Sequence, residues 1–416
     1  MKKTFLLLIS TFAVCTSCLH TRQLATITVE NSLSTERQGE MAEVPLRALP
    51  AKVAKAGTFV ITGPDGKSVP YQITHDSLLI FPTRVLPFAQ TTYTLRKGEY
   101  AGTDTVACGR TYPQRMDDLA WENDKVAFRA YGPTLQQRKE RAFGYDIFTK
   151  RGTSRPVLEG MYEKETNPEN WKKIRALQKT DPKAAARLQF EISYHTDKGY
   201  GMDCYAVGPT LGAGTAALLH DGQIVYPWCY RTCRLLDNGP LRFTAELEFT
   251  PLQAGSVDGI VERRLITLDA GSQFNRTEIT YRGLDHPSPL VVGIVMHQPN
   301  RELTTHTADG YITYPDPTTG KKNGEIYIGA VIPGKVTQTG PEFFSPEESK
   351  QRANALGHVL AHSEYQPGTP FVYYWGYGWS KAGFASYSDW NRHVSQFARQ
   401  VRHPLHILIN GKEMKR

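Results

Sequence analysis

The sequence has little of what marks several large classes of protein. It contains six cysteines in 416 residues, and the four beyond the first eighteen residues form no Cys-x-x-Cys or mixed Cys/His zinc spacing. No apolar run reaches the ~20 residues that span a bilayer. A mean hydropathy of −0.42 excludes a polytopic membrane protein. The chain also lacks a Gly-rich phosphate loop, an internal repeat and a low-complexity tract.

Neither the charge nor the cysteines point to a specialised class. The chain has 49 basic and 41 acidic residues, a formal net charge of +8, and these charges are scattered rather than clustered. We therefore expect no nucleic-acid partner, and a modest positive surplus suits an anionic small molecule at least as well. Cys108, Cys204, Cys229 and Cys233 are expected to be mostly buried free thiols rather than a disulfide framework.

Residues 1–18 are predicted to be a signal peptide of the lipoprotein type. The basic start "MKK" precedes an apolar run at 4–14 that is too short to cross a bilayer. The string "VCTSC" resembles a bacterial lipobox, in which Cys18 becomes the lipidated first residue, and ordinary cleavage nearby is the alternative. We expect an exported protein, either periplasmic or an outer-membrane lipoprotein, that meets the membrane only through this anchor.

The remainder is predicted to be mainly β, in two domains, since 416 residues exceed the ~100–150 of a typical domain. Residues 24–110 alternate in short runs around turns such as "GPDG", which predicts a small antiparallel β-sandwich. Residues 114–416 contain at least nine strand-like segments, among them "KVAFRAYG", "LQFEISYH" and "PFVYYWGYGW", which predicts a large two-sheet antiparallel sandwich. Cap and proline signals at 166–169 and 180–182 predict a short helical insertion, and a last helix is expected from Ser388.

Several strings of the second domain occur in a familiar order. "WENDKVAFRAYGP", "YHTDKGYGMDCYAVGPTLGAG", "DNGPLRF", "LDAGSQFNRTE" and "YYWGYGWSKAGF" resemble the uncharacterised family called domain of unknown function 4861. The likeness runs from about residue 24 to the C-terminus, with Lys125 where arginine is more usual. It implies a glycan-utilisation protein of Gram-negative bacteria, often beside pectin- or uronide-degrading enzymes. It also implies a large domain with the supersandwich fold of galactose mutarotases and several polysaccharide lyases. The resemblance implies a carbohydrate substrate but no particular reaction.

The segment "YHTDKGYGMDCY" is the densest group of titratable side chains. His195 can donate or accept a proton near neutral pH, and Tyr205 can do the same if a neighbouring cation lowers its pKa. Asp203 is expected to bind substrate. The alternative is a structural turn in which Asp203 caps backbone amides. His195, Asp197 and Asp203 fit no standard metal spacing, so neither a metal nor another cofactor is expected.

The segment "WENDKVAFRAYG" places Arg129 and Tyr131 on one face of a strand, with Asn123 just before it. An arginine inside a sheet is costly unless it is paired, and Arg129 can hold a substrate carboxylate through two hydrogen bonds. Asn123 and Tyr131 are expected to assist in binding. The alternative is an internal ion pair of Arg129 with Glu122 or Asp124.

The late segment "YYWGYGWSKAGF" carries a row of aromatic side chains on one face of a strand. Such a row can stack on the apolar face of a sugar, although filling a sandwich core is the commoner use. Trp379, beside Lys381 where the strand ends, is the best candidate for sugar binding, with Lys381 as a further contact. His297 ends another strand and is a candidate substrate-binding residue.

Three functions fit these residues. The favoured one is a lyase acting on uronic-acid-containing oligosaccharides, in which Arg129 with Asn123 holds the carboxylate and His195 and Tyr205 act as base and acid. The second is a mutarotase-like or hydrolytic enzyme with a His acid and a carboxylate base. The third is a non-catalytic glycan-binding protein that depends on the aromatic row. In each case the expected partner is an oligosaccharide or a polysaccharide fragment.

Overall fold

The computed structural model describes residues 22–299 and 302–414. The expected signal peptide, residues 1–18, and the expected lipid anchor, Cys18, lie outside the described residues. Strands make up 45% and helices 18% of the structure, which confirms the mainly β class. No helix in the described ranges combines the length and the apolar character needed to cross a membrane. The four cysteines in these ranges are free thiols, of which Cys204 and Cys229 are buried and Cys108 and Cys233 partly buried.

The small N-terminal domain is a two-sheet sandwich with a six-stranded and a three-stranded sheet, in the orders β28-β27-β1-β7-β3-β4 and β2-β6-β5. Alternating side chains such as Ile27, Val29 and Leu95 fill its core, because successive strand residues point to opposite faces. Its N-terminal elements are β1 (Gln23–Glu30), β2 (Arg37–Pro45), a 3₁₀ helix (Leu46–Ala48), α1 (Ala51–Ala56), β3 (Phe59–Thr62), β4 (Ser68–Val69), β5 (Gln72–Ile73), β6 (Leu78–Val85) and β7 (Gln90–Lys97).

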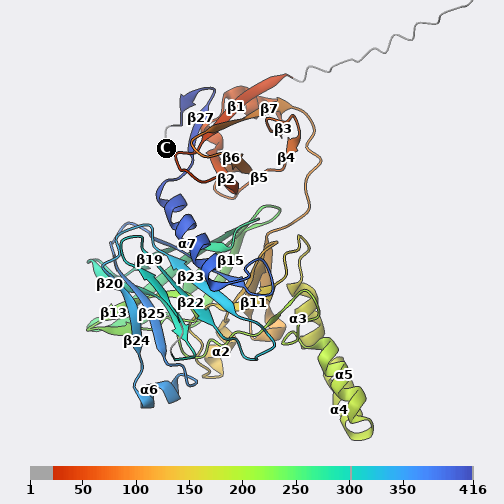
Figure 1. Ribbon diagram of the computed structural model, residues 1–416, viewed down its shortest axis with the longest axis vertical. Helices are drawn as coiled ribbons and strands as arrows, with labels where there is room; N and C mark the ends of the chain where they lie inside the picture. The colour runs from red at the N-terminus through yellow and green to blue at the C-terminus, as the bar shows by residue number, and fades with distance from the viewer. Residues whose placement is uncertain (1–21, 300–301, 415–416) are drawn as a thin grey trace, which may run out of the picture.

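The end of the chain returns to this small sandwich (Figure 1). Strands β27 (His406–Ile409) and β28 (Lys412–Glu413) extend its larger sheet, and Ile409 pairs with Ile27 of β1. From the sequence, these residues are expected in the large domain. They differ from that expectation because a short apolar strand beside an open sheet edge pairs with that edge, and sequence order does not reveal which edge it is.

The large domain also begins earlier than the sequence suggested, since β8 starts at Cys108 and pairs with β9. Its first sheet has the order β12-β11-β10-β9-β8. The elements of this region are β8 (Cys108–Tyr112), a 3₁₀ helix (Pro113–Arg115), β9 (Asp118–Glu122), β10 (Ala127–Ala130), α2 (Pro133–Gln137), β11 (Asp146–Lys150) and β12 (Gly201–Asp203).

Two further sheets complete the large sandwich. The second has the order β14-β13-β20-β25-β24, and the third β15-β16-β18-β19-β26-β23-β22-β21, with β17 beside β18. The strands of the second sheet are β13 (Ala213–His220), β14 (Gln223–Val225), β20 (Ser288–Met296), β24 (Gln338–Phe343) and β25 (Gly357–Tyr365). Those of the third are β15 (Tyr230–Asn238), β16 (Arg242–Phe249), β17 (Leu252–Ala254), β18 (Val257–Asp269), β19 (Phe274–Arg282), β21 (Thr304–His306), β22 (Tyr311–Asp316), β23 (Ile326–Val331) and β26 (Phe371–Trp379).

The first and second sheets pack together on one face of the third. Trp375 of the third sheet stacks on Tyr145 with ring centroids 3.9 Å apart, and it meets the edge of Phe128 of the first sheet at 4.8 Å. Strands β13 and β20 of the second sheet contact β23 of the third. The predicted two-layer sandwich is therefore present, and the aromatic row of β26 lies in the middle of its core.

The helical insertion consists of α3 (Leu158–Thr166), α4 (Pro168–Thr180) and α5 (Pro182–Ile192), of which α4 and α5 project from the large domain as a hairpin (Figure 1). Asn167 and Asp181 cap α4 and α5 by accepting backbone N–H groups, as their positions before proline predict. The strand predicted from "LQFEISYH" is wrong. The capped helix continues to Ile192 because each further residue adds a hydrogen bond at little entropic cost.

The last long helix lies between the two domains (Figure 1). Helix α7 (Tyr387–Arg402) begins one residue before the predicted start and is capped by Ser386. Its buried residues Trp390 and Val394 pack with Phe274 on the other face of the third sheet. Elsewhere a short α6 (Pro346–Gln351) precedes β25.

The role of the C-terminal strand can be tested with a matched pair of substitutions. Ile409→Glu places a carboxylate in the small-sandwich core, where Ile409 is 8% exposed, and should lower the free energy of unfolding by about 2–4 kcal/mol. Leu408→Glu, on the opposite side of the same strand, should cost less than about 1 kcal/mol. Urea denaturation measures both, and equal losses would contradict this assignment of β27.

Candidate functional site

A group of charged side chains lies at one end of the first sheet, where four neighbouring strands begin or end. Strand β9 begins at Asp118, β10 ends beside Arg129, β11 begins at Asp146 and β12 ends at Asp203. These strands are antiparallel neighbours, so the four positions lie at the same end of the sheet, where the strands begin or end. We call the group the strand-end cluster, and its members are Arg115, Asp118, Arg129, Tyr131, Asp146, His195 and Asp203.

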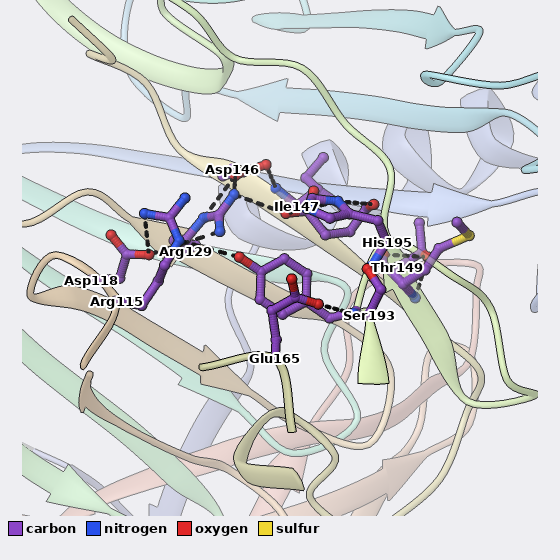
Figure 2. Close-up of polar contacts among 12 residues, drawn as sticks. Arg115, Asp118, Arg129, Asp146, Ile147, Thr149, Glu165, Ser193 and His195 are labelled. Atoms are coloured by element: carbon purple, nitrogen blue, oxygen red, sulfur yellow. Dashed lines mark hydrogen bonds and ion pairs between the residues drawn. The ribbon is translucent and has the colours of Figure 1, made fainter. Parts of the chain in front are cut away.

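Arg129 is the centre of the strand-end cluster. Its Nε donates to Oδ2 of Asp146 over 2.8 Å, and its Nη2 donates to Oδ2 of Asp203 over 3.0 Å. The hydroxyl of Tyr131 donates to the same Asp146 oxygen over 2.8 Å. Figure 2 shows the guanidinium group directed at Asp146. Burial lowers the pKa of Arg129, but the combined effect of Asp146, Tyr131 and Asp203 outweighs burial, so this pKa is raised well above its ordinary value. Arg129 is therefore held by internal carboxylates, although not by the two that the sequence analysis considered.

The cluster contains more acid than base. Asp118, Asp146 and Asp203 face only two guanidinium groups, with Oδ2 of Asp118 lying 3.8 Å from Nη1 of Arg129 and 3.9 Å from Nη1 of Arg115. Burial raises the pKa of Asp118 to about 6, and it raises that of Asp203 to about 6 as well. These two carboxyl groups can therefore take up a proton close to neutral pH.

His195 is the point at which the cluster meets solvent. Its Nδ1 lies 3.1 Å from the backbone oxygen of Asp203 and 3.7 Å from Oδ2 of that residue. The imidazole side chain is 59% exposed, whereas the carboxyl group of Asp203 is buried. Figure 2 shows His195 beside Ser193, on the segment that leads from α5 to β12. His195 and Asp203 thus form a pair that is buried at one end and open at the other.

A second His–Asp pair lies where two strands of the other sheets end. His297 follows β20, and Asp316 is the last residue of β22. Nδ1 of His297 lies 2.6 Å from Oδ2 of the buried Asp316, and the histidine side chain is 19% exposed. The hydroxyl of Tyr314 accepts the backbone N–H of His297 over 3.0 Å and thereby fixes the end of the strand.

Tyr205 connects the two His–Asp pairs. Its ring meets that of His297 edge-on with centroids 5.9 Å apart. Asp203 and Tyr205 are two residues apart, so their Cα atoms are separated by at most about 7 Å. Thr319, three residues after Asp316, donates its backbone N–H to the carbonyl of the intervening Cys204 over 2.9 Å. The two pairs therefore meet around one short segment of chain.

The pKa of Tyr205 moves in the direction opposite to the one proposed from the sequence. Burial raises it well above the ordinary value, and the charges of Asp316 and Asp146 raise it further. The phenol therefore stays protonated at neutral pH and is available to donate a hydrogen bond. Its oxygen is buried without a hydrogen-bond partner in the described part of the chain.

Asn123 does not belong to the strand-end cluster. Its side-chain amide donates to the backbone oxygens of Asp269 and Ser272 over 2.6 and 2.8 Å, and its own oxygen accepts two backbone N–H groups. These bonds hold the turn before β10. The expected binding role for Asn123 has no support in this geometry, because both ends of the amide are bonded to the backbone.

Trp379 and Lys381 form a separate group, which contacts Asp197 in the loop after His195. Trp379 is 1% exposed, and its indole N–H donates to a backbone oxygen over 2.8 Å. The Nζ of Lys381 lies 5.6 Å from the indole ring and 3.8 Å from Oδ2 of Asp197. The whole row of Tyr373, Trp375, Tyr377 and Trp379 is buried. The aromatic row therefore fills the core.

Four residues were not predicted from the sequence, namely Arg115, Asp118 and Asp146 of the strand-end cluster and Asp316 of the second His–Asp pair. Each acid lies at the start or end of an apolar strand, which was a usable signal. Their partners are far away in the sequence, however, and only the antiparallel pairing brings them together. No set of three or more His, Cys, Asp or Glu side chains in the described ranges is placed to hold a metal ion.

Fold and site define a mainly β chain of two sandwiches with two His–Asp pairs at strand ends. The chain belongs to the family described as Domain of unknown function (DUF4861), whose model matches residues 29–407. It is 25% identical over 411 residues to "Uncharacterized protein P7" of Formosa agariphila, covering 92% of this chain and 93% of that protein.

Two solved structures from Enterococcus faecalis show weak similarity. One is an alpha-mannosidase, with 9% identity and a TM-score of 0.40, and the match covers 94% of this chain and 46% of that one. The other is a protein in glycosyl hydrolase family 38, with 8% identity, a TM-score of 0.45 and coverage of 94% and 48%. The chain thus spans about half the length of both, and nothing further follows from these similarities.

The acid excess of the strand-end cluster predicts a pH dependence of stability. With a folded pKa of about 6, Asp118 keeps a proton that the unfolded chain releases near pH 4. Folding therefore takes up a proton between these values, and the contribution of this group to stability falls as pH rises through that window. Relative to Asp118→Asn, the wild type should lose on the order of 2–3 kcal/mol of unfolding free energy between about pH 4 and pH 7.

Urea denaturation at several pH values measures this difference directly. The Asn side chain has the same shape as Asp but no titrating proton, so Asp118→Asn keeps the packing and removes only the titration. A constant difference across the window would show that the pKa of Asp118 is the same in the folded and the unfolded chain and that the acid excess has no energetic consequence.

Proposed function

We propose that this protein is an exported carbohydrate-active enzyme in which His195 and His297 transfer protons to and from the substrate. The observation that carries this proposal is the meeting of two His–Asp pairs, from distant parts of the chain, around the segment Asp203–Tyr205. The family resemblance set out above supports a carbohydrate as substrate. The apolar leader and the lipobox-like string ending at Cys18 support export.

A histidine bonded to a carboxylate or a carbonyl through one ring nitrogen can act as base or acid through the other. At 2.6 Å, the contact with Asp316 places the proton of neutral His297 on Nδ1, which leaves Nε2 as the proton acceptor. His195 is oriented through its Nδ1 by Asp203 and exposes the rest of its ring. One histidine can then accept a proton from substrate while the other donates one.

The charge around the site favours a neutral sugar over a uronide. A lyase must neutralise the carboxylate of its substrate, and Arg129 was expected to do so. In the structure Arg129 already binds Asp146 and Asp203, and the cluster carries more carboxyl than guanidinium groups. The geometry therefore gives the lyase hypothesis less support than the mutarotase-like or hydrolytic one.

Of the mutarotase-like and hydrolytic reactions, the mutarotase-like one needs fewer catalytic groups, because two proton-transferring side chains are enough. One histidine removes the proton of the anomeric hydroxyl while the other protonates the ring oxygen, so the ring bond to the anomeric carbon breaks and a carbonyl forms. Rotation of the carbonyl and reversal of both transfers yields the other anomer. The reaction needs no free carboxylate nucleophile, and Asp146 and Asp203 are both bound to Arg129.

The proposal is tested with His195→Ala and His297→Ala, assayed on a panel of neutral sugars, glycosides and uronide oligosaccharides. Anomer exchange, measured by polarimetry on freshly dissolved sugars, should fall by at least about 100-fold in each variant. His286→Ala is the matched control, since His286 lies next to Asp285 at 3.1 Å on the exposed surface and should retain full activity.

Three outcomes would overturn this assignment. New absorbance from unsaturated uronide products would establish a lyase. Release of reducing ends from glycosides without anomer exchange would establish a hydrolase. Sugar binding without turnover, and without loss in either histidine variant, would indicate a non-catalytic glycan-binding protein.

A further inference from the structure

A cavity of about 620 Å³ lies between the two domains, away from both His–Asp pairs. One wall is the β2 segment 38–45 of the small sandwich, and the opposite wall is the turn between β18 and β19 at 269–274. Helix α7 closes the third side with Phe397 and Gln400. This volume falls within the ~300–1,000 Å³ of small-molecule sites, which occur preferentially at domain interfaces.

An ion pair and a hydrogen bond connect the two domains beside the cavity. Arg242 of the large domain donates from Nε to Asp269 over 2.6 Å and from Nη2 to Glu43 of β2 over 2.5 Å. Arg37 of β2 donates to the backbone oxygen of His403, just after α7, over 2.7 Å. The walls are therefore fixed relative to one another by contacts at their edges.

The lining combines an aromatic face with uncharged polar groups. Phe397 is half-buried, stacks on Phe274 with centroids 4.2 Å apart, and meets the edge of Tyr374 at 5.2 Å. Phe397 lines the cavity, so its ring contributes apolar surface there. Gln38 and Gln400 line the cavity from opposite domains. A flat ring flanked by hydrogen-bonding groups suits a pyranose, which has one apolar face and hydroxyl groups at its rim.

The charges of the cavity are matched internally. Glu43 and Asp269 are bound to Arg242, Glu40 is paired with Arg37, and Arg276 is paired with Glu278. Burial lowers the pKa of His393 to about 4, so this histidine is neutral near pH 7. No surplus of positive charge is therefore available for a carboxylate or a phosphate.

We infer that this interdomain cavity is a second saccharide site, separate from the proposed catalytic site, that binds a neutral disaccharide or the neutral end of an oligosaccharide. The ligand contacts both domains, so binding stabilises their present arrangement. The inference does not depend on the proposed catalytic reaction, because it concerns other residues and requires no proton transfer.

The experiment uses the mature chain carrying His195→Ala and His297→Ala, so that turnover does not interfere with binding. Calorimetric titration with lactose should give saturable binding, and digalacturonate should bind at least about tenfold more weakly. In the same background Phe397→Ala should weaken lactose binding about tenfold by removing the stacking face. Phe190→Ala, which removes an exposed ring on α5, is the control and should leave binding unchanged.

A second variant covers the case in which Phe397→Ala disturbs α7. Ala270→Trp adds bulk to a residue that lines the cavity without removing any contact, and should abolish lactose binding while the unfolding midpoint is kept. Hydrogen exchange should slow in 38–45 and 269–274 when lactose is added. Absence of lactose binding, binding that survives both cavity variants, or preference for digalacturonate would each overturn the inference. None of these results bears on catalysis, which is measured in the chain with both histidines intact.

Discussion

Charges that are buried inside a β-sandwich must be paired within it, and this constraint shapes the large domain. Arg129 lies between Asp146 and Asp203. At the other end of the same sheet, Lys150 of β11 is paired with Glu122 of β9 over 2.6 Å. The carboxylate of Glu122 also accepts the backbone N–H groups of Val157 and Leu158 over 2.8 Å each, and so fixes the start of α3. Breaking such a pair leaves an uncompensated buried charge, which costs about 3–5 kcal/mol. The position of the helical insertion therefore depends on an ion pair within the first sheet.

The same constraint explains why the candidate site is polar and yet well ordered. The strand ends converge at one end of the first sheet, where burial raises the pKa values of Asp118 and Asp203 and the two arginines do not fully offset it. A carboxyl group that titrates near neutral pH beside a partly exposed histidine is a common arrangement at catalytic sites. Bonds to Arg129 hold the inner carboxylates still, which keeps the orientation of His195 fixed while its outer edge is free to meet a ligand.

Local patterns in the sequence predicted the local structure well. Alternating side chains predicted strands such as β1 and β10, and Asn167 and Asp181 marked the starts of helices α4 and α5. The strand predicted across the end of α5 failed because its short run of alternating residues did not outweigh propagation from a capped helix. The sequence also singled out Arg129, Tyr131, His195 and Asp203, which lie in the strand-end cluster, and Tyr205 and His297, whose rings meet edge-on.

What the sequence could not supply was the pairing between distant segments. The acid that holds Arg129 is Asp146 rather than the nearer Glu122 or Asp124, because antiparallel register places Arg129 opposite Asp146. Trp379 was a reasonable sugar-binding candidate, but β26 lies between two other strands under a second layer, so its aromatic face is covered. The return of β27 to the small sandwich follows the same logic, since it depends on which sheet edge is open. That return carries α7 across the gap between the domains, and α7 thereby supplies one wall of the cavity between them.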